Sequence, residues 1–154
     1  AEEFVPRNNV AEYPIWCSVS KKNCLKPIEK EVVYAVRVPK DEVIYFDGGR
    51  WDMVLNNQYI HKDAADAEDF DRLLKSYGLS HTFDIFDRKY TGAFDDVKKR
   101  IWDSWERIFE ITDRSEFVVQ ANLWCIKKEW VKHIIYPGED FFEIVKDMDE
   151  TWIK

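Results

Sequence analysis

The chain has 154 residues, of which 45% are hydrophobic and 16% aromatic, and it carries a formal net charge of −7 at pH 7. This length fits one domain with a single core, so we expect one domain over residues 1–154. The acidic balance disfavours a nucleic-acid backbone or an anionic membrane as partner, because binding phosphates requires a surplus of Lys and Arg.

The first third of the chain predicts three strands. Residues 13–19 are short, apolar and aromatic, and residues 31–39 alternate so that Val32, Tyr34, Val36 and Val38 share one face. Residues 43–46 form a short third strand. The turn that follows places Asp47 where a helix cap is needed.

Helical patterns occupy the middle of the chain. Apolar residues from Trp51 to Tyr59 recur on one helical face, and residues 63–77 form a second helix with Gly78 at its end. Residues 79–90 are irregular. The clearest pattern, residues 93–109, has an apolar side chain every three or four positions, and we expect this third helix to pack on a sheet.

The last part of the chain returns to strands. Residues 117–126 alternate, residues 131–136 form another strand, and residues 140–153 form a terminal helix. Strands at both ends with helices between them indicate an α+β fold. We expect a mixed or mainly antiparallel sheet packed by three to four helices. A further segment upstream of Ala1 is left open as a possibility.

The signatures of the commonest catalytic classes are absent from the sequence. It has no dinucleotide or P-loop glycine motif, no zinc-protease helix motif and no hydrolase elbow. His61, His81 and His133 lie far apart, so no metal site is predicted. Glu106 would need burial or a charged neighbour to serve as a general base, and a hydrolase built on it is the weakest reading.

Three cysteines, Cys17, Cys24 and Cys125, form no C-x-x-C pair and leave an odd count. This argues against a secreted disulfide framework and favours a reducing cytoplasm. Cys17 and Cys125 lie in strand patterns, where buried cysteine is common. No apolar run approaches the roughly 20 residues that span a bilayer.

Polar residues that interrupt apolar patterns are the candidate ligand-binding residues. Amides in a helix pattern and amides or hydroxyls beside an indole on a strand face are typical of small-molecule clefts. The same residues have an alternative explanation without a ligand. The amides in the helix pattern can mark the end of the helix, and the polar residues of the strands can lie on a face that is solvated or half covered by a helix. The candidates are Trp16, Ser18, Asn56, Asn57, Gln120, Asn122 and Trp124.

An ordered set of segments resembles one bacterial family. The segments "YPIW", "RVPKDEVIYFD", "WDMVLNNQYI", "SWERIFEI" and "QANLWCIKKEWV" together are similar to the family called domain of unknown function 3841. The resemblance runs from about Tyr13 to Val131. It implies no established activity.

A more distant resemblance links these elements to ADP-ribosyltransferase-like folds. It implies a cleft for NAD or a related nucleotide, lined by Trp16, Gln120 and Asn122. Asn122 stands where those enzymes carry a glutamate that orients the NAD ribose. An amide can bond a ribose hydroxyl, but it cannot supply the negative charge that stabilises an oxocarbenium-like centre.

Two functional hypotheses follow. In the first, the chain is a soluble, non-catalytic or degenerate interaction or regulatory protein that meets a protein partner. In the second, it is an ADP-ribosyltransferase-like protein that binds NAD or a related nucleotide. A pocket bounded by Trp16, Asn122 and Trp124 would favour the second, and a large exposed apolar patch would favour the first.

Overall fold

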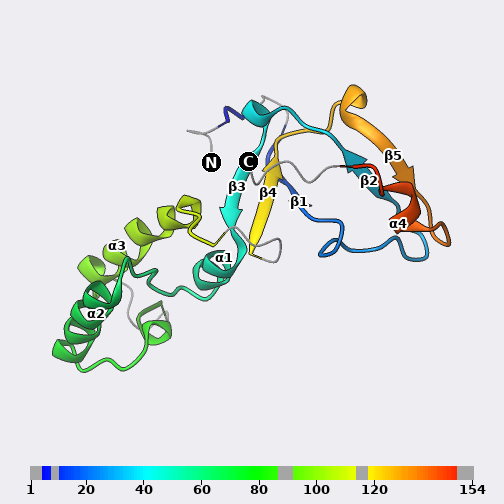
Figure 1. Ribbon diagram of the computed structural model, residues 1–154. Coiled ribbons are helices and arrows are strands. Elements are labelled where there is room, and N and C mark those ends of the chain that lie inside the picture. Colours follow the sequence, from blue (N-terminus) through cyan, green and yellow to red (C-terminus); the bar gives the residue numbers. More distant parts are fainter. Residues whose placement is uncertain (1–4, 8–10, 87–91, 114–117, 149–154) are drawn as a thin grey trace. The chain divides into compact units, whose positions relative to one another are not determined.

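The fold is α+β, as predicted, with two small antiparallel sheets and four α-helices in the part of the chain that the structure describes. A computed structural model describes residues 5–7, 11–86, 92–113 and 118–148 (Figure 1). The chain forms two compact units, residues 1–45 with 113–154, and residues 46–112. The expectation of one domain over residues 1–154 stays a prediction.

The first sheet has the strand order β1 (Ile15–Ser18), β4 (Val119–Leu123), β3 (Ile44–Asp47). β1 and β4 are antiparallel, with Ile15 opposite Leu123 and Ser18 opposite Gln120. The predicted alternation of β4 is confirmed, because Val119, Ala121 and Leu123 are buried while Gln120 and Asn122 are only partly so. Phe117, placed in this strand from the sequence, lies outside the described residues.

The second sheet is a ribbon of β2 (Val33–Val36) and β5 (Val131–Ile135), which run antiparallel. Its inner face packs against α4 (Phe141–Ile144) (Figure 1). The predicted shared face of Val32 and Tyr34 is the exposed one, whereas the alternate residues Val33 and Ala35 join the core. The terminal helix was predicted to reach residue 153, but α4 ends at Ile144, and residues 149–153 lie outside the described part.

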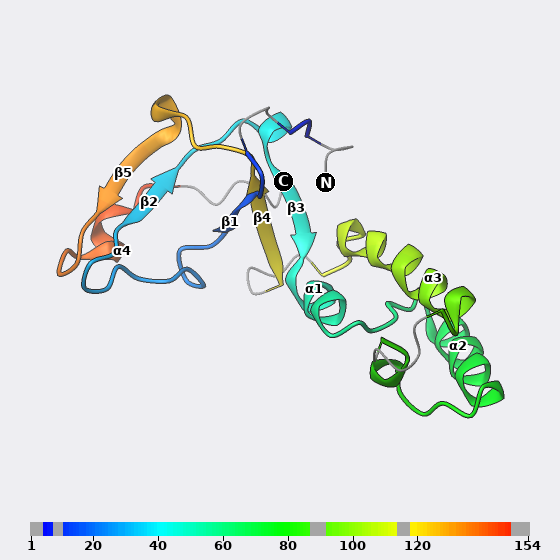
Figure 2. The ribbon, with the colours of Figure 1, turned by 180° about the vertical axis from the view of Figure 1, so that it is seen from behind.

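The second unit is helical, and its core joins α2 (Ala64–Ser76) to α3 (Asp95–Ser104), which lie side by side in Figure 2. The predicted caps are confirmed: Asp47 accepts a hydrogen bond from the Arg50 amide, and Gly78 ends α2 with a positive φ of 71°. Asp63 caps the start of α2.

The third helix differs from its prediction in two ways. α3 ends at Ser104 and continues as a 3-10 helix over Trp105–Phe109. Its buried residues Val97 and Ile101 pack against Phe70 and Leu74 of α2 and not against a sheet. Only the end of the predicted segment meets a strand, because Ile108 shares a core cluster with Phe46 of β3. An apolar stripe shows that a helix is covered but does not reveal whether the cover is a helix or a sheet. The segment predicted as irregular contains a 3-10 helix, Thr82–Phe86.

The first helix also ends earlier than its pattern predicts. α1 (Gly48–Leu55) stops before Tyr59, with Asn56 as its C-cap and Asn57 at a positive φ of 52°. Asparagine tolerates this left-handed conformation better than most residues, which explains the stop. Tyr59 therefore lies outside the helix and stacks on Phe70, with ring centroids 4.0 Å apart.

A carboxylate ties three segments of the second unit together. Asp66 accepts hydrogen bonds from the Tyr59 hydroxyl at 2.8 Å and from the Lys62 amide at 2.8 Å. Its oxygens also lie 3.1 Å from Arg100 and 3.1 Å from Arg107. The cluster fixes α2 against α3 and the segment that follows it.

Among the described residues, no helix combines the length and the apolar character that crossing a bilayer demands.

Candidate functional site

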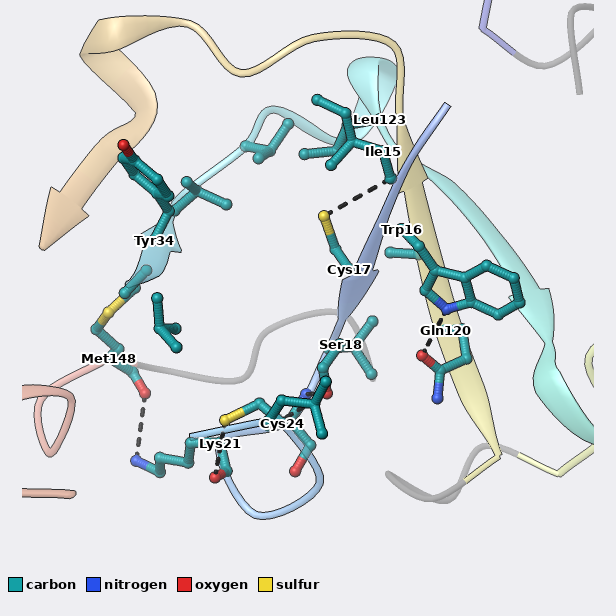
Figure 3. A pocket seen from close by; sticks show the side chains of 18 of the residues that line it. Ile15, Trp16, Cys17, Ser18, Lys21, Cys24, Tyr34, Gln120, Leu123 and Met148 are labelled. Carbon is teal, nitrogen blue, oxygen red and sulfur yellow. Dashed lines mark hydrogen bonds between the residues drawn. The ribbon is translucent and has the colours of Figure 1, made fainter. Parts of the chain in front are cut away.

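A pocket of about 690 Å³ lies within the first unit (Figure 3). In this view β1, with Ile15, Cys17 and Ser18, stands on one side, and Tyr34 of β2 stands on the other. Phe141 and Val145, at and just beyond α4, also line the pocket. Lys21 and Cys24, from the segment that connects β1 to β2, line it as well.

The lining follows the two strands residue by residue. All four residues of β1 and all four of β2 line the pocket. β4 contributes only Gln120, Ala121 and Leu123, and no residue of β5 takes part. The pocket therefore runs along β1 and β2, and it also touches β4 and, through Tyr45, β3 (Ile44–Asp47).

Most of the lining is apolar, and its charged members are basic. Among the described residues that line the pocket, only Lys21 and Arg37 carry a charged side chain, and none is His, Asp or Glu. The Lys21 ammonium donates to the carbonyl oxygens of Lys146 at 3.3 Å and Met148 at 3.4 Å. Lys21 thereby holds the chain that follows α4 beside the pocket, whereas Arg37 is exposed.

Three of the sequence-predicted residues, Trp16, Ser18 and Gln120, line the pocket. Because Ser18 lies opposite Gln120 in the register, and Trp16 is two residues from Ser18, all three share one face of the sheet. The Trp16 indole, half exposed, donates to the Gln120 side-chain oxygen at 3.0 Å (Figure 3). The Ser18 hydroxyl donates to the Ser20 carbonyl at 3.1 Å.

Asn122 and Trp124 belong to the same face but are not among the residues that line the pocket. The Trp124 indole donates to the carbonyl of Val5 at 2.7 Å, so the N-terminal segment contacts this end of the face. The Asn122 side-chain oxygen is buried and has no hydrogen-bond partner among the described residues.

Asn56 and Asn57 belong to the second unit and have local roles. The Asn56 side chain donates to the carbonyl of Asp52 at 2.7 Å, and its backbone caps α1. These contacts agree with the interpretation that the two amides terminate the helix.

The cysteines divide into two groups. Cys17 and Cys24 line the pocket, whereas Cys125 does not. Burial raises the pKa of the Cys17 thiol to about 11, so the thiol is protonated at neutral pH. A thiol in that state is a poor nucleophile, because the thiolate is the reactive form.

The described residues contain no candidate metal site, since no three His, Cys, Asp or Glu side chains are placed to hold an ion together. Glu106 is exposed.

Sequence reasoning missed Lys21, Arg37 and the residues after β5 as pocket components. Lys21 and Arg37 carry no local signal of a site, because charged residues in loops and at strand ends are ordinary. Phe141 and Val145 read only as the apolar positions of a helix.

Comparison with known proteins gives one family and no individual relative. No curated protein and no solved structure matches the chain significantly. The family described as "Domain of unknown function (DUF3841)" matches residues 1–132, which include β1, β2 and β4, whereas α4 lies beyond the match. The chain belongs to this family of domains of unknown function.

Proposed function

We propose that the chain is a non-catalytic binding protein whose first unit holds its partner in the pocket along β1 and β2. The observation that carries this proposal is the pocket itself. Its volume of about 690 Å³ falls within the range of roughly 300–1,000 Å³ that is usual for ligand sites. An apolar lining with few polar groups is also typical of such sites.

The chemistry of the lining supports binding without catalysis. General acid–base catalysis needs a group that exchanges protons near neutral pH, most often His, Asp or Glu. The described lining contains none of these. Burial raises the pKa of Cys17 to about 11 and also raises that of Tyr45, so these two side chains stay protonated at neutral pH.

The three cysteines supply a direct test of occupancy. We expect 8-anilinonaphthalene-1-sulfonate, an apolar probe with one negative charge, to bind and to slow alkylation of Cys17 and Cys24 several-fold. Cys125, outside the pocket, should react at an unchanged rate. Alkylation by iodoacetamide followed by peptide mass analysis measures all three sites in one sample. Equal slowing at Cys125, or none at Cys17 and Cys24, would remove the pocket as the binding site.

The raised pKa of Cys17 sets the conditions of that experiment. A pKa of about 11 instead of 9.0 lowers the thiolate fraction about a hundredfold, while the greater basicity raises nucleophilicity roughly eightfold. Cys17 without ligand should therefore react about tenfold more slowly than an ordinary thiol. Labelling at pH 9 keeps this slow reaction measurable.

NAD is the second candidate occupant, because Trp16 and Gln120 line the pocket together with two basic side chains that could meet phosphates. In calorimetric titration, NAD held there should bind the native protein more tightly than the Gln120→Ala variant. The Asn122→Ala variant should bind like the native protein, since Asn122 does not line the pocket. If both substitutions weakened NAD binding equally, NAD would occupy the cleft that the sequence resemblance implies, with Asn122 in its lining. The absence of a binding signal in the titration of the native protein would exclude NAD.

A further inference from the structure

The identity of the occupant can be taken one step further, on the basis of the proposed function. We propose that the pocket receives an extended segment of a partner protein, which adds as a strand between β1 and β2. This added strand would join the two sheets into one.

The continuous lining by β1 and β2 is the first observation. Successive side chains of a strand point to opposite faces, so a pocket on one face of a sheet is lined by every second residue. Here every residue of both strands takes part, from Ile15 to Ser18 and from Val33 to Val36. A pocket that touches both kinds of residue is not confined to one face of the strand.

Each of the two strands has an edge with no paired strand in the described part of the chain. Within the described residues β1 pairs with β4 alone and β2 pairs with β5 alone, so each strand has one side without a neighbouring strand. Both of these strands line the pocket along their whole length. An open edge presents a row of backbone N–H and C=O groups that pairs readily with another extended chain. Addition of a strand to such an edge is an established mode of peptide recognition.

The length of the edges fixes the length of the segment. At about 3.3 Å per residue, a strand of four residues is about 13 Å long. A segment of four to six residues would pair with both edges. Its alternate side chains would meet the apolar lining that includes Leu123 and Val145.

Charge complementarity defines one side chain of the partner. The chain carries a net charge of −7, yet the described charged residues at the pocket are the basic Lys21 and Arg37. Lys21 is engaged with the carbonyls of Lys146 and Met148, whereas Arg37 is exposed at the end of β2. The segment should therefore be apolar in alternation and should carry an acidic side chain that reaches Arg37.

Synthetic peptides test this proposal with the full chain. The probe is a set of fluorescent ten-residue peptides of alternating Val and Thr, with one Glu moved through every position, read by anisotropy. The best peptide is then remade with N-methyl groups at alternate backbone nitrogens, which removes donors and keeps every side chain. We expect at least a tenfold loss of affinity on methylation, and slower hydrogen exchange in both β1 and β2 when the unmethylated peptide is bound.

A charge exchange is the matched control. Arg37→Glu should weaken the Glu peptide at least fivefold and should favour the same peptide with Lys in place of Glu. Lys40→Glu makes a comparable charge change at an exposed residue outside the pocket lining and should leave both affinities unchanged.

Other outcomes overturn the proposal in distinguishable ways. If no peptide binds, or methylation has no effect, while the naphthalene sulfonate or NAD still protects Cys17 and Cys24, the pocket is a small-molecule site and only the strand partner is wrong. If the protein without peptide has the mass of a dimer, and hydrogen exchange is already slow in β1 and β2, the occupant is a second copy of the chain. If no probe protects the two cysteines, the proposed function fails as well.

Discussion

Replacement of Asp66 by Asn should lower the free energy of unfolding by about 2 kcal/mol, because a charged acceptor shared by several donors would be lost. The carboxylate receives the Tyr59 hydroxyl and the Lys62 amide and lies 3.1 Å from each of Arg100 and Arg107. The amide of Asn has one acceptor oxygen in place of two. Arg107, 23% exposed, would then lose its carboxylate partner, and Arg100, 30% exposed, would keep only its ion pair with Asp69. Solvent reaches this cluster, so the loss should stay below that of a fully buried pair.

The same carboxylate makes stability depend on pH in a defined window. Partial burial of Asp66 disfavours its charge, but hydrogen bonds from Lys62, Tyr59 and Arg100 and the charge of Arg107 outweigh burial and lower the pKa from 3.8 to about 2. Because the folded pKa is below the unfolded one, the stabilisation is complete above about pH 4. It is lost progressively as the pH falls from 4 toward 2.

Urea denaturation at several pH values measures both effects. The native protein should lose stability between pH 4 and pH 2 more steeply than the Asp66→Asn variant, which lacks this titration. Asp69→Asn is the control, because Asp69 also contacts Arg100 but is more than half exposed. An equal loss in the two variants at pH 7 would show that general charge balance, and not the Asp66 cluster, is responsible.

The features predicted correctly from the sequence depend on short stretches of chain. The cap at Asp47 and the left-handed turn at Gly78 are set by neighbouring residues, and both are confirmed. The alternation of β4 is equally local, so its buried and open faces could be predicted. The end of α1 was ambiguous because asparagine both interrupts and caps helices, and only the backbone at Asn57 decides between these roles.

The features that could not be predicted depend on contacts between distant residues. In the ribbon, Val32 and Tyr34 are as apolar as Val33 and Ala35, so alternation alone does not reveal the face that α4 covers. The same limit applies to the site. Trp16 and Gln120 were both candidates, but their hydrogen bond joins positions 104 residues apart. No local feature of the sequence indicates that Arg37 lines the same pocket as Trp16 and Gln120.

Substitution of Phe141 by Ala should cost about 3–4 kcal/mol, which is typical of removing a buried aromatic ring. Phe141 is 7% exposed and forms a core cluster with Ile135 and Val145, and it also lines the pocket. Loss of its ring would loosen α4 against the ribbon and enlarge the pocket. We therefore expect at least a tenfold weaker affinity for the naphthalene sulfonate as well as the loss of stability.

The neighbouring ring is the matched control for this prediction. Phe142 packs edge-on against Phe141, with ring centroids 5.4 Å apart, and Lys26 lies within 4.4 Å of the centre of each ring. Phe142 is 54% exposed and does not line the pocket, so Phe142→Ala should cost less than about 1 kcal/mol and leave probe affinity unchanged. Affinities are compared where near-ultraviolet circular dichroism shows both variants folded. If Phe141→Ala lost stability but bound the probe as tightly as the native protein, α4 would be a structural support and not a wall of the binding site.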